Sequence, residues 1–86
     1  MTSANRSITL CMIARDEEAM IGQAISSVAS IVSQIIVIDT GSTDRAVEIA
    51  REHGAEVLFF EWTNDFASAR NIGLAKATGS WILVLS

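Results

Sequence analysis

Residues 35–44 read IIVIDTGSTD, in which four β-branched apolar residues are followed by an acid and a run of small polar residues. The apolar run is too short for a buried helix and predicts a strand that is covered on both faces of a parallel sheet. Asp39 stands where this strand leaves the core. Because ligands of open α/β sheets bind at the carboxyl ends of the strands, Asp39 is a candidate binding residue. An Asp that closes a strand can equally cap the turn that follows it.

Length and composition limit the classes of protein that fit. The chain has 86 residues, a net charge of −4 and one cysteine, and we expect residues 1–86 to form one truncated domain. The negative charge argues against nucleic acid as a partner. The longest apolar run, WILVL, is too short to span a membrane, and the N-terminus lacks an apolar signal segment. We therefore expect no transmembrane segment and a cytoplasmic location.

Strand-like and helix-like patterns alternate along the whole chain. The expected order is βαβαβαβ, which predicts an α/β, Rossmann-like three-layer sandwich with a four-stranded parallel sheet. The carboxyl ends of all four strands then lie at one edge, where residues 14–17, 39–44 and 61–65 should meet. The expected strands are residues 7–14, 35–39, 56–60 and 81–85, and the expected helices begin near residues 17, 45 and 66.

Polar residues before each helix-like segment are candidate caps. We expect Asp16 to cap the first helix, with Glu17 and Glu18 at its positive end. Asp44 should cap the second helix, and Asn64 or Asp65 the third. Gly54 is the expected end of the second helix.

The edge lacks the glycine-rich phosphate loops of two large nucleotide-binding classes. The loop after the first strand reads IARDEE and contains no GxGxxG, and the chain has no GxxxxGK[ST]. Two acids remain, Glu17 and Asp39, whose carboxylates can accept hydrogen bonds from ribose hydroxyls or from a base N–H. From these residues alone, nucleotide binding and a purely structural cap are both open.

Three segments taken together resemble a known family: TLCMIARDEE, SQIIVIDTGSTDRAVEIAREHGAEV and FEWTNDFASARNIGLAKATGSWILVL. They are similar to the N-terminal, nucleotide-binding half of glycosyltransferase family 2, which has the GT-A fold. The likeness is strongest to the bacterial branch that includes lipopolysaccharide-core-type transferases. It implies the donor-binding half of an enzyme that transfers a sugar from a nucleoside-diphosphate donor, most simply a UDP-sugar, to an acceptor hydroxyl.

The resemblance also implies roles for individual residues. The family's Pro-x-Tyr-Asn-Glu loop lies against the nucleoside and matches residues 13–17 here, so Ala14, Arg15 and Glu17 are expected to bind the nucleotide. Proline and tyrosine are missing, and the guanidinium of Arg15 can stack on a base in place of the aromatic ring. Asp39 matches the first acid of the family's Asp-Asp/Thr-Gly-Ser motif, which binds uracil or ribose.

A second family motif, Ala-Arg-Asn-x-Gly, matches residues 69–73. The resemblance places Arg70 and Asn71 near the nucleotide, where the fixed cation of Arg70 offsets phosphate charge. The alternative is a surface arginine on an amphipathic helix.

The family's Asp-x-Asp motif, which holds a divalent metal against the donor diphosphate, should follow the fourth strand, but Ser86 stands at its first position. We therefore assign no metal ligand and no catalytic residue, and we expect Mg²⁺ or Mn²⁺ only in a complete relative. The 86-residue chain is predicted to be inactive by itself. The alternative is a non-catalytic α/β module that binds nucleotide or a protein. In the family further strands pair beside the fourth strand, so the resemblance implies an unpaired apolar edge at WILVL, which predicts a homodimer or an exchange of strands between chains.

Overall fold

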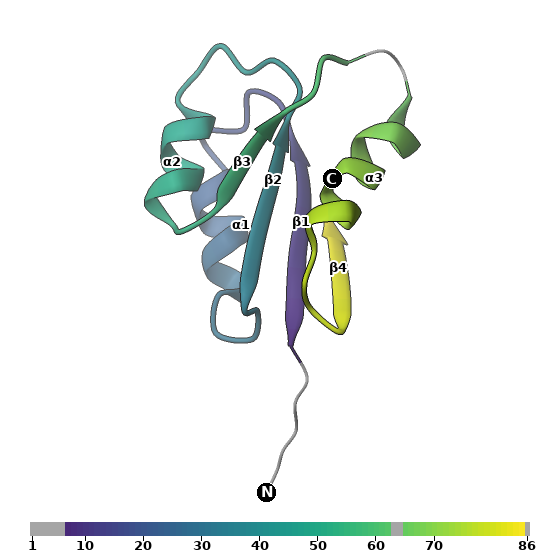
Figure 1. Ribbon diagram of the computed structural model, residues 1–86. Coiled ribbons are helices and arrows are strands. Elements are labelled where there is room, and N and C mark those ends of the chain that lie inside the picture. Colours follow the sequence, from purple (N-terminus) through teal and green to yellow (C-terminus); the bar gives the residue numbers. More distant parts are fainter. Residues whose placement is uncertain (1–6, 63–64, 86) are drawn as a thin grey trace, which may run out of the picture.

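The computed structural model describes residues 7–62 and 65–85. The elements follow the predicted order (Figure 1). Their bounds are β1 (Ile8–Ala14), α1 (Ile21–Val28), β2 (Gln34–Asp39), α2 (Ala46–Glu52), β3 (Glu56–Phe59), α3 (Phe66–Lys76) and β4 (Trp81–Leu85).

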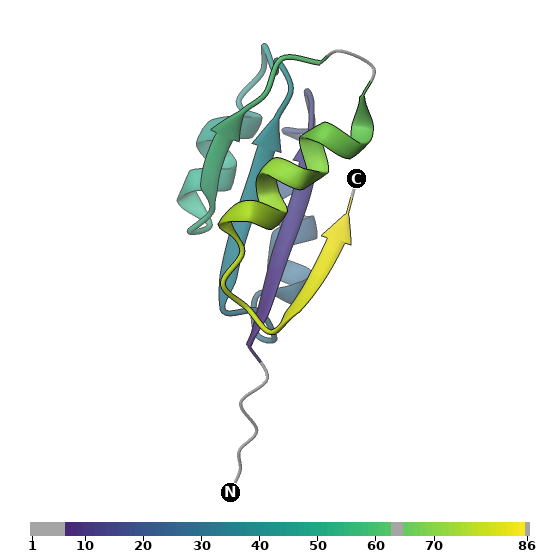
Figure 2. The same ribbon diagram turned by 45° about the vertical axis from the view of Figure 1, so that its right-hand side comes forward.

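The four strands form one parallel sheet in the order β3-β2-β1-β4. Helices α1 and α2 cover one face of this sheet and α3 crosses the other (Figures 1 and 2). The predicted α/β, Rossmann-like three-layer arrangement is therefore confirmed. Among the described residues no helix is long and apolar enough to cross a membrane.

Alternation along the strands divides the core into two layers. On the side of α1 and α2, Leu10 and Val37 pack with Ile21, Ile25 and other apolar residues. On the side of α3, the buried residues are Cys11, Ile13, Ile36, Ile38 and Ala69. Because β1 and β2 are covered on both faces, their side chains are apolar at nearly every position, as expected for the centre of a parallel sheet.

Helix α3 lies very close to β1. A Cβ added at Gly73 would overlap the Cys11 Sγ atom, while its next neighbours would be Ile38 Cδ1 at 3.6 Å and Cys11 Cβ at 3.7 Å. Ala69, one turn earlier, is fully buried. The small residues of the Ala-Arg-Asn-x-Gly segment thus form the contact face of α3, since residues four apart share one side of a helix.

One of the predicted caps is an N-cap, one bonds the helix start from the residue before the N-cap, and one is wrong. The Asp65 carboxylate accepts a hydrogen bond from the Ser68 N–H at the start of α3, and the Asp44 carboxylate accepts one from the Ala46 N–H at the start of α2. Asp16, in contrast, does not cap α1, which begins only at Ile21 and has no acid in its first turn. The Asn64 alternative lies outside the described residues.

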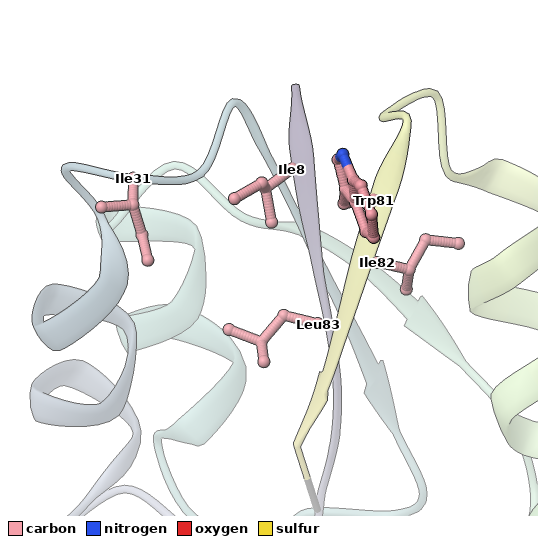
Figure 3. Close-up of a pocket in the computed structure, with 5 residues that line it drawn as sticks. All are labelled: Ile8, Ile31, Trp81, Ile82 and Leu83. Atoms are coloured by element: carbon pink, nitrogen blue, oxygen red, sulfur yellow. The ribbon is translucent and has the colours of Figure 1, made fainter. Parts of the chain in front are cut away.

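Strand β4 forms one edge of the sheet and is only partly covered. Trp81 is 60% exposed, and Ile82 and Val84 are also exposed. A hollow of about 340 Å³ adjoins the start of β4, between the strand and the end of α1 (Figure 3). Its lining residues are Ile8, Ile31, Trp81, Ile82 and Leu83.

Candidate functional site

Two loops leave the sheet side by side at the carboxyl ends of its central strands (Figure 1). Residues 15–20 connect β1 to α1, and residues 40–45 connect β2 to α2. Ala14 and Asp39, the last residues of β1 and β2, are register partners. The structure therefore brings Ala14, Arg15, Glu17 and Asp39 to one edge of the sheet, where ligands of α/β proteins bind.

The Asp39 side chain is buried, with 6% of its surface exposed, and it turns toward its own loop. One carboxylate oxygen accepts hydrogen bonds from the N–H groups of Gly41, at 3.3 Å, and Ser42, at 3.2 Å. The other oxygen accepts from the Ser42 N–H at 3.4 Å. Asp39 thus fixes the turn after β2. Since an ionised carboxylate offers about four acceptor sites, acceptor capacity remains for a ligand.

The loops are joined through Asp16. Its Oδ1 accepts hydrogen bonds from the Thr43 N–H, at 2.7 Å, and from the Thr43 hydroxyl, at 3.3 Å. In return the Asp16 N–H donates to the Ser42 hydroxyl at 2.9 Å, and the Glu18 N–H donates to the Asp44 carboxylate at 3.0 Å. We call these four bonds the loop clasp.

The backbone of Asp16 has a left-handed conformation, with φ +53°. Asp is one of the few residues other than Gly that tolerate this region. The hydrogen bond from the Thr43 N–H holds the pKa of the Asp16 carboxyl below its usual range, and the bond from the Thr43 hydroxyl and the charge of Arg15 act in the same direction. The clasp therefore favours the ionised carboxylate.

Arg15 and Glu17 extend from the β1–α1 loop into solvent. Both side chains are exposed, and within the described part of the chain neither side chain has a hydrogen-bond or ion-pair partner. The Glu17 carbonyl accepts from the N–H groups of Met20 and Ile21, which begins the turn that leads into α1. The loop backbone is thus fixed while these two charged side chains are available to a ligand.

Arg70 and Asn71 lie on α3, which crosses the opposite face of the sheet (Figure 2). Arg70 is half-buried and Asn71 is exposed. Over residues 7–62 and 65–85, no hydrogen bond or ion pair links Arg70 to a carboxylate or to the two loops. The structure therefore does not join these two residues directly to Asp39, and it leaves the guanidinium without an anionic partner in the described chain.

The described residues contain no group of three or more His, Cys, Asp or Glu side chains that can hold a metal ion. They do not fit a metal site by themselves. Ser86, at the position of the expected metal motif, lies outside the described residues.

Cys11 is fully buried, and this burial raises the pKa of its thiol, while the positive charge of Arg70 acts in the opposite direction with a smaller effect. A buried neutral thiol of this kind is a packing residue.

Asp16, Ser42 and Thr43 were missed as site residues in the sequence analysis. Asp16 was interpreted as a helix cap because it precedes a helical pattern. The overlooked signal is that an Asp two residues after the end of a strand, followed by two further acids, is suited to a left-handed turn residue as much as to a cap. Ser42 and Thr43 gave no separate signal, since small polar residues are common in turns.

The sequence model of the family described as glycosyl transferase family 2 matches residues 9–86. The chain belongs to glycosyltransferase family 2. Among curated relatives of this family member, a TPR repeat-containing protein of Synechococcus elongatus is 48% identical over 96% of the chain and 21% of its own length. An uncharacterized glycosyltransferase of Rickettsia typhi is 33% identical over 91% of the chain and 26% of its own length.

Solved structures agree with the family assignment. Glucosyl-3-phosphoglycerate synthase of Mycobacterium tuberculosis, in complex with Mn²⁺, UDP and glucosyl-3-phosphoglycerate, is 28% identical and superposes with a TM-score of 0.76. The match covers 92% of this family 2 chain and 32% of the synthase. Mannosyl-3-phosphoglycerate synthase of Rubrobacter xylanophilus, at 22% identity and a TM-score of 0.72, shares the fold. The chain thus spans about a fifth to a third of the length of these relatives.

Proposed function

We propose that this chain is the donor-binding part of a glycosyltransferase and that it binds the nucleoside end of a nucleoside-diphosphate sugar, with UDP as the nucleotide. The observation that carries the proposal is the match, over 92% of the chain, to a synthase whose structure holds UDP and Mn²⁺. The two loops joined by the clasp, together with Asp39 at the end of β2, supply charged and polar side chains that can bind a nucleoside.

Asp39 is the residue we assign to the uracil or the ribose. Its carboxylate is held by two backbone N–H groups of its own loop through bonds of 3.2–3.4 Å. These bonds are long, since N–H···O bonds in proteins have a mode of about 2.9–3.0 Å. A ribose hydroxyl or a base N–H can therefore add a shorter bond to the same fixed carboxylate.

Arg70 and Arg15 are assigned to the phosphates and the base. Arg70 has no anionic partner in the described chain, and a guanidinium binds phosphate oxygens through two parallel N–H bonds. Arg15 is exposed beside the Asp39 edge, and its planar group can stack on a base. We assign Glu17 to the ribose hydroxyls. Ala14, as the register partner of Asp39, borders the nucleoside, and Asn71 accompanies Arg70.

The reaction proposed for the complete protein is transfer of the sugar to an acceptor hydroxyl. The hydroxyl oxygen forms a bond to the anomeric carbon, the bond from that carbon to the diphosphate breaks, and the hydroxyl proton passes to a general base. A divalent cation supplies charge for the leaving diphosphate when bound. Because the described residues hold neither a metal set nor an assigned base, the 86-residue chain is expected to bind donor without turnover.

The test is an NMR titration of the isotope-labelled chain with UDP, with ADP and GDP in parallel. We expect saturable amide shifts at Arg15, Glu17, Asp39 and Arg70, and larger affinity for UDP than for the purine nucleotides. A folded chain that gives no saturable shifts with UDP would overturn the proposal. Purified chain that transfers sugar from a UDP-sugar would overturn the expected inactivity.

Asp39→Asn is the variant that tests the assigned carboxylate. It keeps the shape and one acceptor oxygen but removes the charge, so we expect UDP affinity to fall about tenfold or more. Glu52→Gln is the matched control. It removes one acid from the exposed end of α2, where Glu52 has no partner among the described residues, and it should leave UDP affinity unchanged.

The ordered motifs favour the bacterial branch with lipopolysaccharide-core-type transferases, and location in the cytoplasm, as one unit of residues 1–86, stays a prediction. The alternative is a non-catalytic nucleotide- or protein-binding module, which is favoured by the lack of a metal set among the described residues. UDP binding without binding of a UDP-sugar would favour that alternative.

A further inference from the structure

The loop clasp joins two segments that are far apart in the sequence. Its bonds connect residues 26 and 27 positions apart, and all of them are made by exposed groups. Exposed hydrogen bonds make only a modest contribution to global stability, because bonds to water replace them on unfolding. The main effect of the four hydrogen bonds of the loop clasp is therefore local: they fix one loop relative to the other.

The clasp lies between the residues that the proposed function assigns to the nucleoside. Asp16 stands between Arg15 and Glu17 in the first loop, and its partner Thr43 follows the turn that Asp39 holds in the second loop. Without the clasp, the remaining hydrogen bonds between the two halves of the site, among the described residues, are the strand pairing of Ala14 with Asp39 and the bonds from Thr40 to the Ala14 carbonyl, and α1 and α2 still pack through Ile21 and Ala46 beneath the loops. Such loops must then be ordered when the ligand binds, and this lowers affinity.

We propose that Asp16 is a positioning residue that presets the two loops for nucleotide binding through its hydrogen bonds to Thr43. It does not touch the ligand in this scheme. Both bonds from Thr43 end on the same oxygen, Oδ1, so one acceptor oxygen in this position is sufficient. The inference rests on the proposed nucleotide-binding function of the same edge.

Two substitutions separate the acceptor oxygen from the charge and from the backbone strain. Asp16→Gly removes the acceptor, and glycine tolerates the left-handed backbone of this position without strain. Asp16→Asn keeps an oxygen at the place of Oδ1 and also tolerates that backbone. Ser30→Gly is the matched control, since it adds a glycine at an exposed loop position between α1 and β2. This loop lies at the amino ends of the strands, away from the site.

The experiment measures UDP affinity by calorimetry and exchange of the Thr43 amide proton by NMR, on the full chain. We expect Asp16→Gly to raise the Kd for UDP about tenfold or more and to accelerate exchange of the Thr43 amide. Asp16→Asn should stay within about threefold of the wild-type Kd, and Ser30→Gly should match the wild type in both measurements.

The outcomes distinguish this inference from the proposed function. If the wild type binds UDP and Asp16→Gly binds it equally well, the positioning role is wrong while the proposed function stands. If Asp16→Asn is as weak as Asp16→Gly, the charge and not the clasp is required, and the inference is again wrong. A folded wild-type chain that does not bind UDP overturns the proposed function and, with it, any positioning role.

Discussion

The contact between α3 and β1 gives a sharp test of how the fold positions Arg70. In Gly73→Ala the new Cβ would overlap the Cys11 Sγ atom, which is fully buried on β1, a strand paired with β2 on one side and β4 on the other. Overpacking of a core typically costs about 1–3 kcal/mol, and we expect the upper end here. Replacing a helix glycine with alanine returns about 1 kcal/mol, so the net loss of stability should be about 2 kcal/mol.

The second variant, Cys11→Ala, removes the sulfur that the new methyl group meets. Alone it leaves a small void, and we expect a loss of about 1 kcal/mol. In the double variant the methyl group introduced at position 73 fills that void, because its remaining neighbours would be Ile38 Cδ1 at 3.6 Å and the position 11 Cβ at 3.7 Å, which are ordinary contacts. The double variant should therefore be within about 1 kcal/mol of the wild type, with a favourable coupling of at least about 2 kcal/mol.

Urea unfolding followed by circular dichroism measures all four proteins of this cycle. The sign and size of the coupling decide the outcome. If the two effects add to within about 0.5 kcal/mol, the helix and strand are not in the close contact described, and α3 does not hold Arg70 by this packing. A single variant Gly73→Ala that is more stable than the wild type would refute the reasoning outright.

Two further predictions concern the loops and the sheet edge. The hydrogen bond from the Thr43 N–H is the main cause that lowers the pKa of Asp16, and the bond from the Ser68 hydroxyl is the main cause that lowers the pKa of Asp65. Both ionised carboxylates therefore stabilise the fold above about pH 4, and this stabilisation is lost as pH falls through their lowered folded-state pKa values. Asp16→Asn and Asp65→Asn should each flatten the fall of the urea midpoint below about pH 4, and an unchanged slope would contradict this. At the edge, β4 carries no charge or proline that blocks pairing, so we expect concentration-dependent dimers by sedimentation that Val84→Lys abolishes; a wild-type monomer at high concentration would contradict a homodimer.

Most of the fold can be predicted from local sequence patterns, but the ends of individual strands and helices cannot. The strands of the sheet centre are apolar at nearly every position, so their place and direction were predictable. The third strand was expected to reach Phe60 but ends at Phe59, although the Phe60 N–H still donates to the Asp39 carbonyl. The third helix ends at Lys76 because Ala77 adopts an extended backbone. These endings depend on tertiary contacts more than on residue type.

The candidate site was predictable only in part, because its chemistry depends on pairs of loops. Asp39 and Ala14 could be placed, since the end of a buried strand is visible in the sequence. The function of Asp16 could not, because its partner Thr43 lies 27 positions away and nothing local distinguishes a residue that caps a helix from one that accepts bonds from a second loop. Only the sheet register, which brings β1 beside β2, makes the pair.

The residues proposed to order the nucleoside site and the residue proposed to bind the diphosphate lie on opposite faces of the sheet, because they belong to different helix layers. Asp44 accepts bonds both from the Ala46 N–H in α2 and from the Glu18 N–H in the first loop, so the clasp is continuous with the helix layer on that face. Arg70 belongs to the opposite layer, held against β1 through Gly73. Since the sheet separates these layers, a change in the clasp should alter affinity for the nucleoside without moving Arg70. The proposed contact of Arg70 with the diphosphate should therefore respond to Gly73→Ala and Cys11→Ala and not to the variants of Asp16.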